Sequence, residues 1–271
     1  MDIRLVVVDV DGTIAGKSND VTEPIRKAIA SVQAKGIPVA IATGRMYQSA
    51  LRFHKRIKSS QPLIAYNGAW IQNPRDGRLH RHIPVPADLA LDLVEYLRQP
   101  QWKPYLGVHL YIDDALYVSY VNNDTVSYGK RSGIKPIIVE DLRTVIHKHP
   151  TKILAMGHDS AIIKQLWETL SARYTPEQLY LTQSTETFFE ATHPEATKGE
   201  AVAYLAEKVL GLNRDQVMTI GDNFNDVSML SYAGLAIAMG DAPEDVKSLA
   251  HWVAPSVESD GVAAALEKFI P

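Results

Sequence analysis

The chain has 271 residues, a formal net charge of −3 at pH 7, and 46% hydrophobic and 22% charged residues. This length suits one large domain or, more often, two, and the composition is that of an ordinary soluble globular protein. With no positive excess, the chain is not expected to bind nucleic acid or a membrane surface through its general charge. It contains no Cys, which excludes disulfides and thiolate metal sites.

Targeting and membrane signals are missing from the amino-acid pattern. No apolar run approaches the roughly 20 residues that a membrane-spanning helix needs. Met1-Asp2-Ile3-Arg4 leads directly into the first apolar run, which is not the pattern of a signal peptide. We therefore expect a cytoplasmic protein.

The first part of the chain is predicted to alternate strands with helices. The run Leu5–Val8 is β-branched and wholly apolar, as in a strand buried on both faces. Thr22 is a plausible N-cap for the first helix, and Pro24 fits its first turn. This order implies right-handed crossovers and a parallel sheet. The expected helices are 23–34 and 46–57, and the further strands are 38–42 and 62–66.

The rhythm changes after about residue 82. Pro84 and Pro86 interrupt the chain, and two strands then flank Asp113-Asp114 as in a hairpin. Hairpin partners imply an antiparallel or mixed sheet, so this region is predicted to be α+β. Its expected helices are 87–98, a polar helix after the hairpin, and 160–172, and its strands are 108–112, 116–120, 152–156, 179–183 and 187–191.

A buried parallel rhythm returns from Thr197. The fold class is therefore α/β: a Rossmann-like parallel-sheet core of residues 1–83 and 191–271, interrupted by an inserted α+β cap at 84–190. The expected elements of this last part are helices 199–210, 225–231 and 261–269 and strands 216–220 and 235–238.

Two carboxylates end the first strand. Asp9 and Asp11 are spaced i, i+2, which points them to roughly the same side, and Gly12 lets the backbone turn closely around what they hold. Two like charges so close need a cation between them, or one must keep its proton. The structural alternative is an Asp pair that caps a turn.

Three further polar segments are expected at the same edge of the sheet, where open α/β sheets bind ligands. They are Thr43-Gly44, Thr197-Lys198-Gly199 and Gly221-Asp222-Asn223-Phe224-Asn225-Asp226. Three carboxylates on loops suit a hard cation, of which Mg²⁺ is the best match. Thr43, Gly44 and Lys198 offer the donors and positive charge that a phosphate dianion needs.

Each of these segments also has an ordinary structural explanation when taken alone. Lys198 could be a surface lysine near a helix start, and Gly221-Asp222-Asn223 a turn with an N-cap. Arg45 could equally contact substrate or form a salt bridge. His147 and His149 have no evident third ligand and are interpreted as solvated. The joint arrival of four segments on one sheet edge favours a site.

The four segments together resemble the motifs of the haloacid dehalogenase superfamily. Within it the chain is most similar to the Cof-type phosphatases of subfamily IIB, whose cap lies between the second and third motifs. The first motif corresponds to Asp-Val-Asp-Gly-Thr-Ile, the second to Ala-Thr-Gly-Arg, the third to Thr-Lys-Gly and the fourth to Gly-Asp-Asn-Phe-Asn-Asp. Tyr66-Asn67-Gly68-Ala69 matches a further element of this branch. The resemblance covers nearly the whole chain.

The resemblance implies roles for three carboxylates. Asp9 would attack phosphorus and become an aspartyl-phosphate. Asp11 would protonate the leaving alcohol and later deprotonate the hydrolytic water, so it must start protonated. The Mg²⁺ ion would bind a phosphate oxygen, Asp9, the backbone carbonyl of Asp11, and Asp222.

The resemblance also implies supporting roles. Thr43, the N–H of Gly44, and Lys198 would hold the phosphoryl oxygens. Asn225 would support the phosphate or the water shell of the metal. Asp226 would not bind the metal directly but would orient Lys198 or a metal-bound water.

The expected function is hydrolysis of a small phosphorylated metabolite: a sugar phosphate, a nucleotide or a phosphorylated cofactor. The insertion carries 10 Lys and Arg against 13 Asp and Glu, so it is not suited to gripping a nucleic acid. Two alternatives stay open. A phosphomutase of the same superfamily would pass the phosphoryl group to a second hydroxyl. A receiver-like signalling module would use a phosphorylated Asp as a switch, but it would need neither Asp11 nor the insertion.

Overall fold

The structure, a computed structural model, describes residues 2–183 and 185–271 and divides into two compact units. One unit, here the core unit, comprises the chain up to Arg81 together with Thr197–Pro271. The other, here the insertion unit, comprises His82–Ala196. The chain stays with the insertion's sheet past residue 190, because the strand Phe188–Thr192 still pairs there.

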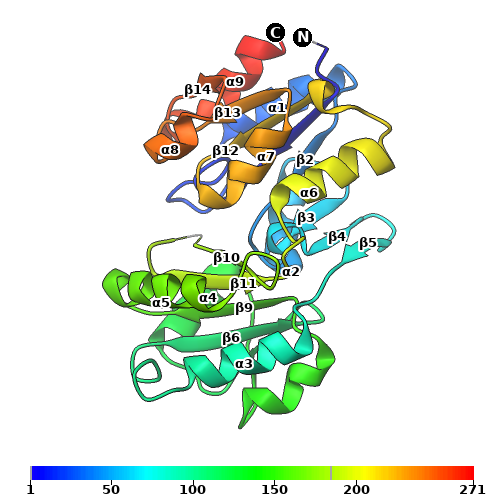
Figure 1. Ribbon diagram of the computed structural model, residues 1–271. Coiled ribbons are helices and arrows are strands. Elements are labelled where there is room, and N and C mark those ends of the chain that lie inside the picture. The colour runs from blue at the N-terminus through cyan, green and yellow to red at the C-terminus, as the bar shows by residue number, and fades with distance from the viewer. Residues whose placement is uncertain (1, 184) are drawn as a thin grey trace. The chain divides into compact units, whose positions relative to one another are not determined.

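A five-stranded parallel sheet forms the centre of the core unit (Figure 1). Its order is β14-β13-β12-β1-β2, so the first strand of the chain lies inside the sheet. Val6 pairs with Met218 on one side and Val39 on the other. The strands are β1 (Leu5–Val8), β2 (Val39–Ile41), β12 (Val217–Gly221), β13 (Leu235–Ala238) and β14 (Trp252–Val253).

Helices cover both faces of this sheet, which is why β1 is apolar at every position. Leu5 and Val7 belong to one apolar cluster with residues of α6 and α7. Helices α1 and α9 pack against each other in a separate layer (Figure 1). The helices of the core unit are α1 (Glu23–Ala34), α2 (Tyr47–Arg56), α6 (Lys198–Ala203), which continues as a π-helical segment (Tyr204–Val209), α7 (Val227–Tyr232), α8 (Glu244–Lys247) and α9 (Gly261–Phe269).

The strand expected at 62–66 does not simply extend the parallel sheet. Its counterpart, β3 (Leu63–Ala65), belongs to a three-stranded sheet with β4 (Trp70–Gln72) and β5 (Leu79–His82). One parallel bridge, between Ala42 and Ile64, joins it to the end of β2. A tight reversal directly after β3 brings β4 back antiparallel to it.

The insertion unit is a mainly antiparallel sheet of six strands, in the order β10-β11-β9-β6-β7-β8. Asp113 and Asp114 both have positive φ, which makes the tight hairpin turn between β6 and β7. The strands are β6 (Gly107–Ile112), β7 (Ala115–Val118), β8 (Ile137–Ile138), β9 (Lys152–Met156), β10 (Tyr180–Thr182) and β11 (Phe188–Thr192). The helices are α3 (Ala87–Leu97), α4 (Asn123–Ser132) and α5 (Ser160–Arg173).

The insertion unit has its own hydrophobic core. Leu110, Ile153 and Phe189 on the sheet pack in one cluster with Val94 of α3 and Leu166 of α5. The predicted fold class, an α/β parallel-sheet core with an inserted α+β unit, is therefore confirmed. Within the described ranges, no helix is both long enough and apolar enough to span a bilayer.

Candidate active site

The predicted site residues gather at the carboxyl edge of the core sheet. Asp9 follows β1 directly, Asp222 follows β12, and Thr43 lies two residues beyond β2. Lys198 is the first residue of α6. Because parallel strands end at one edge, residues more than 200 positions apart in the chain become neighbours there.

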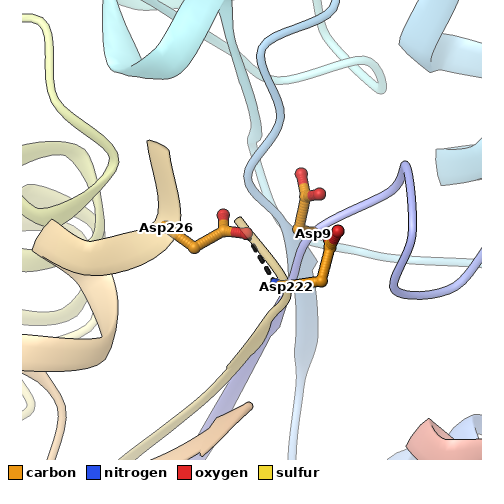
Figure 2. A group of neighbouring side chains, drawn as sticks. All are labelled: Asp9, Asp222 and Asp226. Carbon is orange, nitrogen blue, oxygen red and sulfur yellow. Dashed lines mark hydrogen bonds between the residues drawn. The ribbon is translucent and has the colours of Figure 1, made fainter. Parts of the chain in front are cut away.

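Three carboxylates form a tight acidic group. Asp9, Asp222 and Asp226 each place one oxygen within 4.8 Å of the others. Figure 2 shows the carboxylates of Asp9 and Asp222 turned to the same side, with Asp226 beside them. The backbone N–H groups of Asp222 and Asn223 donate to Oδ2 of Asp226, at 2.8 and 3.0 Å. These two bonds fix the orientation of the Asp226 carboxylate.

Lys198 is completely buried among these acids. Its Nζ donates to Oδ1 of Asp9 at 2.7 Å and to Oδ1 of Asp226 at 2.5 Å. Burial disfavours the ammonium form, but the charges of Asp226 and Asp9 outweigh it and raise the pKa of Lys198 above its ordinary value. The side chain is a fixed cation inside the protein, not a solvated surface lysine.

The acidic group carries more negative charge than Lys198 balances. Burial, with the nearby Asp226 carboxylate, raises the pKa of Asp9 to about 7, although Lys198 acts in the opposite direction. Burial and the charges of Asp226 and Asp9 raise the pKa of Asp222 to about 9. Buried carboxylates that resist ionisation in this way are a good set of oxygen ligands for a hard divalent cation.

The loop after β1 presses against Asp222. Gly12 has φ +78°, and a Cβ atom built on it would lie 2.2 Å from Oδ2 of Asp222. The next residue, Thr13, donates its hydroxyl to Oδ1 of Asp222 at 2.9 Å. Glycine is therefore required here both by the backbone conformation and by the space.

Arg45 forms a two-pronged ion pair with Asp11. Its Nε and Nη2 donate to Oδ2 and Oδ1 of Asp11 at 2.7 and 2.6 Å, and Nη2 also donates to Asn19. The guanidinium lies over the ring of Phe53, 4.7 Å from its centroid. The sequence left open whether Arg45 contacts substrate or forms a salt bridge, and the structure shows the salt bridge with Asp11. Both oxygens of the Asp11 side chain accept hydrogen bonds from this guanidinium.

The expected phosphate-binding residues surround a side chain that the sequence interpretation did not assign to the site. Thr43 and Asn225 are both buried. The Nδ2 of Asn225 donates to Oδ1 of Asn67 at 3.1 Å, and a Cβ atom built on Gly44 would lie 3.0 Å from that same oxygen. In the sequence, Asn67 belonged to the segment Tyr66-Asn67-Gly68-Ala69 that resembles a further element of the family branch, but no role in the site was assigned to it. His147 and His149 are exposed in the insertion unit, outside the acidic group.

The parallel sheet thus ends in buried carboxylates, a buried lysine and loops that contain glycine, an arrangement suited to a metal ion and an anionic ligand. The sequence pattern of the haloacid dehalogenase-like hydrolases matches residues 6–266. The chain belongs to this family, and the expected class of enzyme, a phosphatase of the haloacid dehalogenase type, is confirmed.

Individual relatives align with this chain over nearly its full length. A Haemophilus influenzae protein described as a candidate phosphatase is 30% identical over 271 residues and covers all of both chains. The Bacillus subtilis protein named 5-amino-6-(5-phospho-D-ribitylamino)uracil phosphatase YitU is 24% identical over 98% of this chain and 97% of its own. The crystal structure of TM0651 from Thermotoga maritima shares the fold with a TM-score of 0.82 and 30% identity, covering 98% of this chain and 97% of that one.

Proposed function

We propose that the protein is a Mg²⁺-dependent phosphatase that hydrolyses a small phosphorylated metabolite through an aspartyl-phosphate on Asp9. The observation that carries the proposal is the buried contact of Lys198 with Asp9, beside the carboxylate of Asp222. This arrangement supports the proposal, because a candidate nucleophile, a fixed cation and a candidate metal ligand lie close together.

The residues fit a magnesium ion. Asp9, Asp222 and the backbone carbonyl of Asp11 would hold it. Asp226 is not among these ligands, because Lys198 occupies one of its oxygens and two backbone N–H groups occupy the other. When bound, the ion supplies positive charge. This charge keeps the carboxylates of Asp9 and Asp222 ionised and reduces their repulsion of the phosphate.

Asp9 acts as the nucleophile. Lys198 holds one of its oxygens, so the carboxylate has a fixed direction before the substrate arrives. A carboxylate oxygen of Asp9 forms a bond to phosphorus while the bond from phosphorus to the leaving oxygen breaks. Water then attacks the aspartyl-phosphate, which releases inorganic phosphate and restores Asp9.

Asp11 moves the protons. It gives a proton to the leaving oxygen in the first step and takes one from the attacking water in the second. Its bidentate contact with Arg45 favours the carboxylate, which is the form needed for the second step. For the first step Asp11 must gain a proton and give up one of its hydrogen bonds to Arg45.

The transferring phosphoryl oxygens are held by donors that are already in place. These are the Thr43 hydroxyl, the Gly44 N–H, the Lys198 ammonium and the Asn225 amide, which all come from loops of the core unit. Donors fixed in a buried site stabilise developing charge without reorganising at the moment of reaction.

The choice of substrate is assigned to the insertion, residues 84–190. The core unit already provides a nucleophile, cation and phosphate donors, so the insertion is left to select the leaving group. A relative named for a phosphorylated ribitylaminouracil supports a small metabolite as the class of substrate.

Release of inorganic phosphate from a panel of sugar phosphates, nucleotides and phosphorylated cofactors tests the proposal. Activity should vanish in EDTA and return with Mg²⁺, and Asp9→Asn should remove it while the fold persists. Asp245→Asn, an exposed residue of α8, is the matched control and should keep full activity. Full turnover without metal, or more than about a tenth of wild-type kcat in Asp9→Asn, contradicts the mechanism.

A further inference from the structure

Three consecutive residues between β3 and β4 have left-handed backbone conformations. Tyr66, Asn67 and Gly68 have φ values of 52°, 55° and 103°. The conformation is natural for glycine and tolerated by asparagine, but it is strained for a tyrosine. Such backbone strain persists only where the surroundings impose it, and it concentrates at functional sites.

The backbone of this segment is bound to both sides of Gly44. The N–H of Tyr66 donates to the carbonyl of Arg45 at 2.9 Å, and the N–H of Asn67 donates to the carbonyl of Thr43 at 3.0 Å. Two successive N–H groups can reach these carbonyls because the chain turns tightly at Tyr66 and Asn67. The loop that offers the Thr43 hydroxyl and the Gly44 N–H is thereby fixed.

The same segment also fixes the start of α6. A Cβ atom on Gly68 would lie 2.4 Å from the carbonyl oxygen of Thr197 and 2.9 Å from Cβ of Ala201. The backbone therefore approaches α6 as closely as only glycine permits, directly beside the residue that precedes Lys198.

The Asn67 side chain completes the connection. It is fully buried, and its Oδ1 accepts the hydrogen bond from Nδ2 of Asn225. A Cβ atom built on Gly44 would lie only 3.0 Å from the same oxygen, so Asn67 also packs close to the Gly44 loop. One short segment thus contacts all three loops that carry phosphate donors.

We infer that Asn67 is a positioning residue for the transferring phosphoryl group. Its side-chain oxygen accepts the hydrogen bond from Asn225, so its part is to hold that amide in place. It holds the Asn225 amide and the Gly44 loop at a fixed separation, so that their donors converge on one phosphate. This inference rests on the proposed function, and it adds a residue that acts through the donors.

The test is Asn67→Gly, which keeps the left-handed backbone and removes the side chain. Binding of inorganic phosphate in the presence of Mg²⁺ is measured by calorimetry, and kcat and KM are measured with p-nitrophenyl phosphate. We expect phosphate binding to weaken about tenfold and kcat to fall, because Asn225 loses its buried partner. Lys58→Gly is the control, since Lys58 also has positive φ but lies exposed after α2, and it should change neither value.

A double-variant cycle separates positioning from general stability. Asn225→Ala should weaken phosphate binding as Asn67→Gly does, and the double variant should be no worse than the poorer single variant. Additive losses, or phosphate binding within twofold of wild type in folded Asn67→Gly, overturn the inference. Asn67→Ser, which is uncharged and too short to accept the hydrogen bond from Asn225, replaces the glycine variant if that one does not fold. It should also weaken phosphate binding, and unchanged binding in the folded variant overturns the inference.

Failure of the proposed function looks different. In that case the wild type releases no phosphate from any ester, or Asp9→Asn stays active. The calorimetric comparison does not depend on turnover, and it still decides whether Asn67 organises an anion site.

Discussion

The raised pKa values in the acidic group predict that the metal-free protein loses stability as the pH rises. A carboxyl with a folded-state pKa above its unfolded value binds its proton more tightly in the native state. Stability therefore falls with increasing pH between the two values. For Asp222 this interval runs from about 4 to about 9, and for Asp9 it runs from about 4 to about 7.

The interval from pH 7 to pH 9 isolates Asp222. Other groups of residues 2–183 and 185–271 with a shifted pKa do not interfere in this interval. Buried histidines such as His109 are neutral in the folded and unfolded states above pH 7, and Lys198 titrates above pH 9. One proton held only by the native state changes the free energy of unfolding by about 1.4 kcal/mol per pH unit. The expected loss is thus up to about 3 kcal/mol, or roughly 6–12 °C in Tm for a chain of this size.

Thermal melts followed by circular dichroism at pH 7, 8 and 9 in EDTA measure this loss. Added Mg²⁺ should remove it, because the metal binds the ionised carboxylates and so stabilises more as the pH rises. Asp222→Asn, which cannot titrate, should melt at nearly the same temperature across the interval. Asp245→Asn should keep the wild-type slope. A flat wild-type profile in EDTA, or an unchanged slope in Asp222→Asn, would refute the reasoning.

Three shorter predictions follow from the same geometry. Gly12→Ala should raise the Mg²⁺ concentration needed for half-maximal activity at least about tenfold, because the added Cβ atom displaces Asp222. Titration of activity against Mg²⁺ measures this concentration, and an unchanged midpoint contradicts the prediction. Arg45→Lys should lower kcat about tenfold in steady-state assays, because lysine cannot hold both oxygens of Asp11. A kcat equal to that of the wild type would show that the ion pair is dispensable. Replacing residues 84–190 by a short linker should cripple turnover of the preferred metabolite far more than that of p-nitrophenyl phosphate, provided that the remaining core melts cooperatively; retained selectivity would place the specificity in the core.

Elements with strong local patterns were predictable from the sequence. The helix Glu23–Ala34 and the strands Lys152–Met156 and Leu235–Ala238 match their expected bounds residue by residue. Each has a clear apolar stripe or a short buried run between polar ends. Strands Trp70–Gln72 and Leu79–His82 were missed, because short strands with polar residues lack such a pattern and form only through their partners.

The candidate site was predictable to the extent that it follows from topology. Asp9, Lys198 and Asp222 could be brought together because strand ends of a parallel sheet share one edge. The Arg45–Asp11 and Asn225–Asn67 contacts could not, since they join residues 34 and 158 positions apart through side-chain directions. Nothing local in the sequence specifies those directions.

Lys198 lies close to the point where the chain passes from the insertion unit back into the core unit. This position bears on how freely the sequence of the insertion can change. The insertion unit ends at Ala196, so the ammonium lies only two residues inside the core unit. Thr197 between them is braced: its hydroxyl accepts from the N–H of Glu200, and its carbonyl is packed against Gly68. The N–H of Gly199 is bound to the hydroxyl of Ser228 on the other side. We therefore expect sequence changes within the insertion to leave the position of the Lys198 ammonium unchanged, so that the same acidic group can be combined with different insertions.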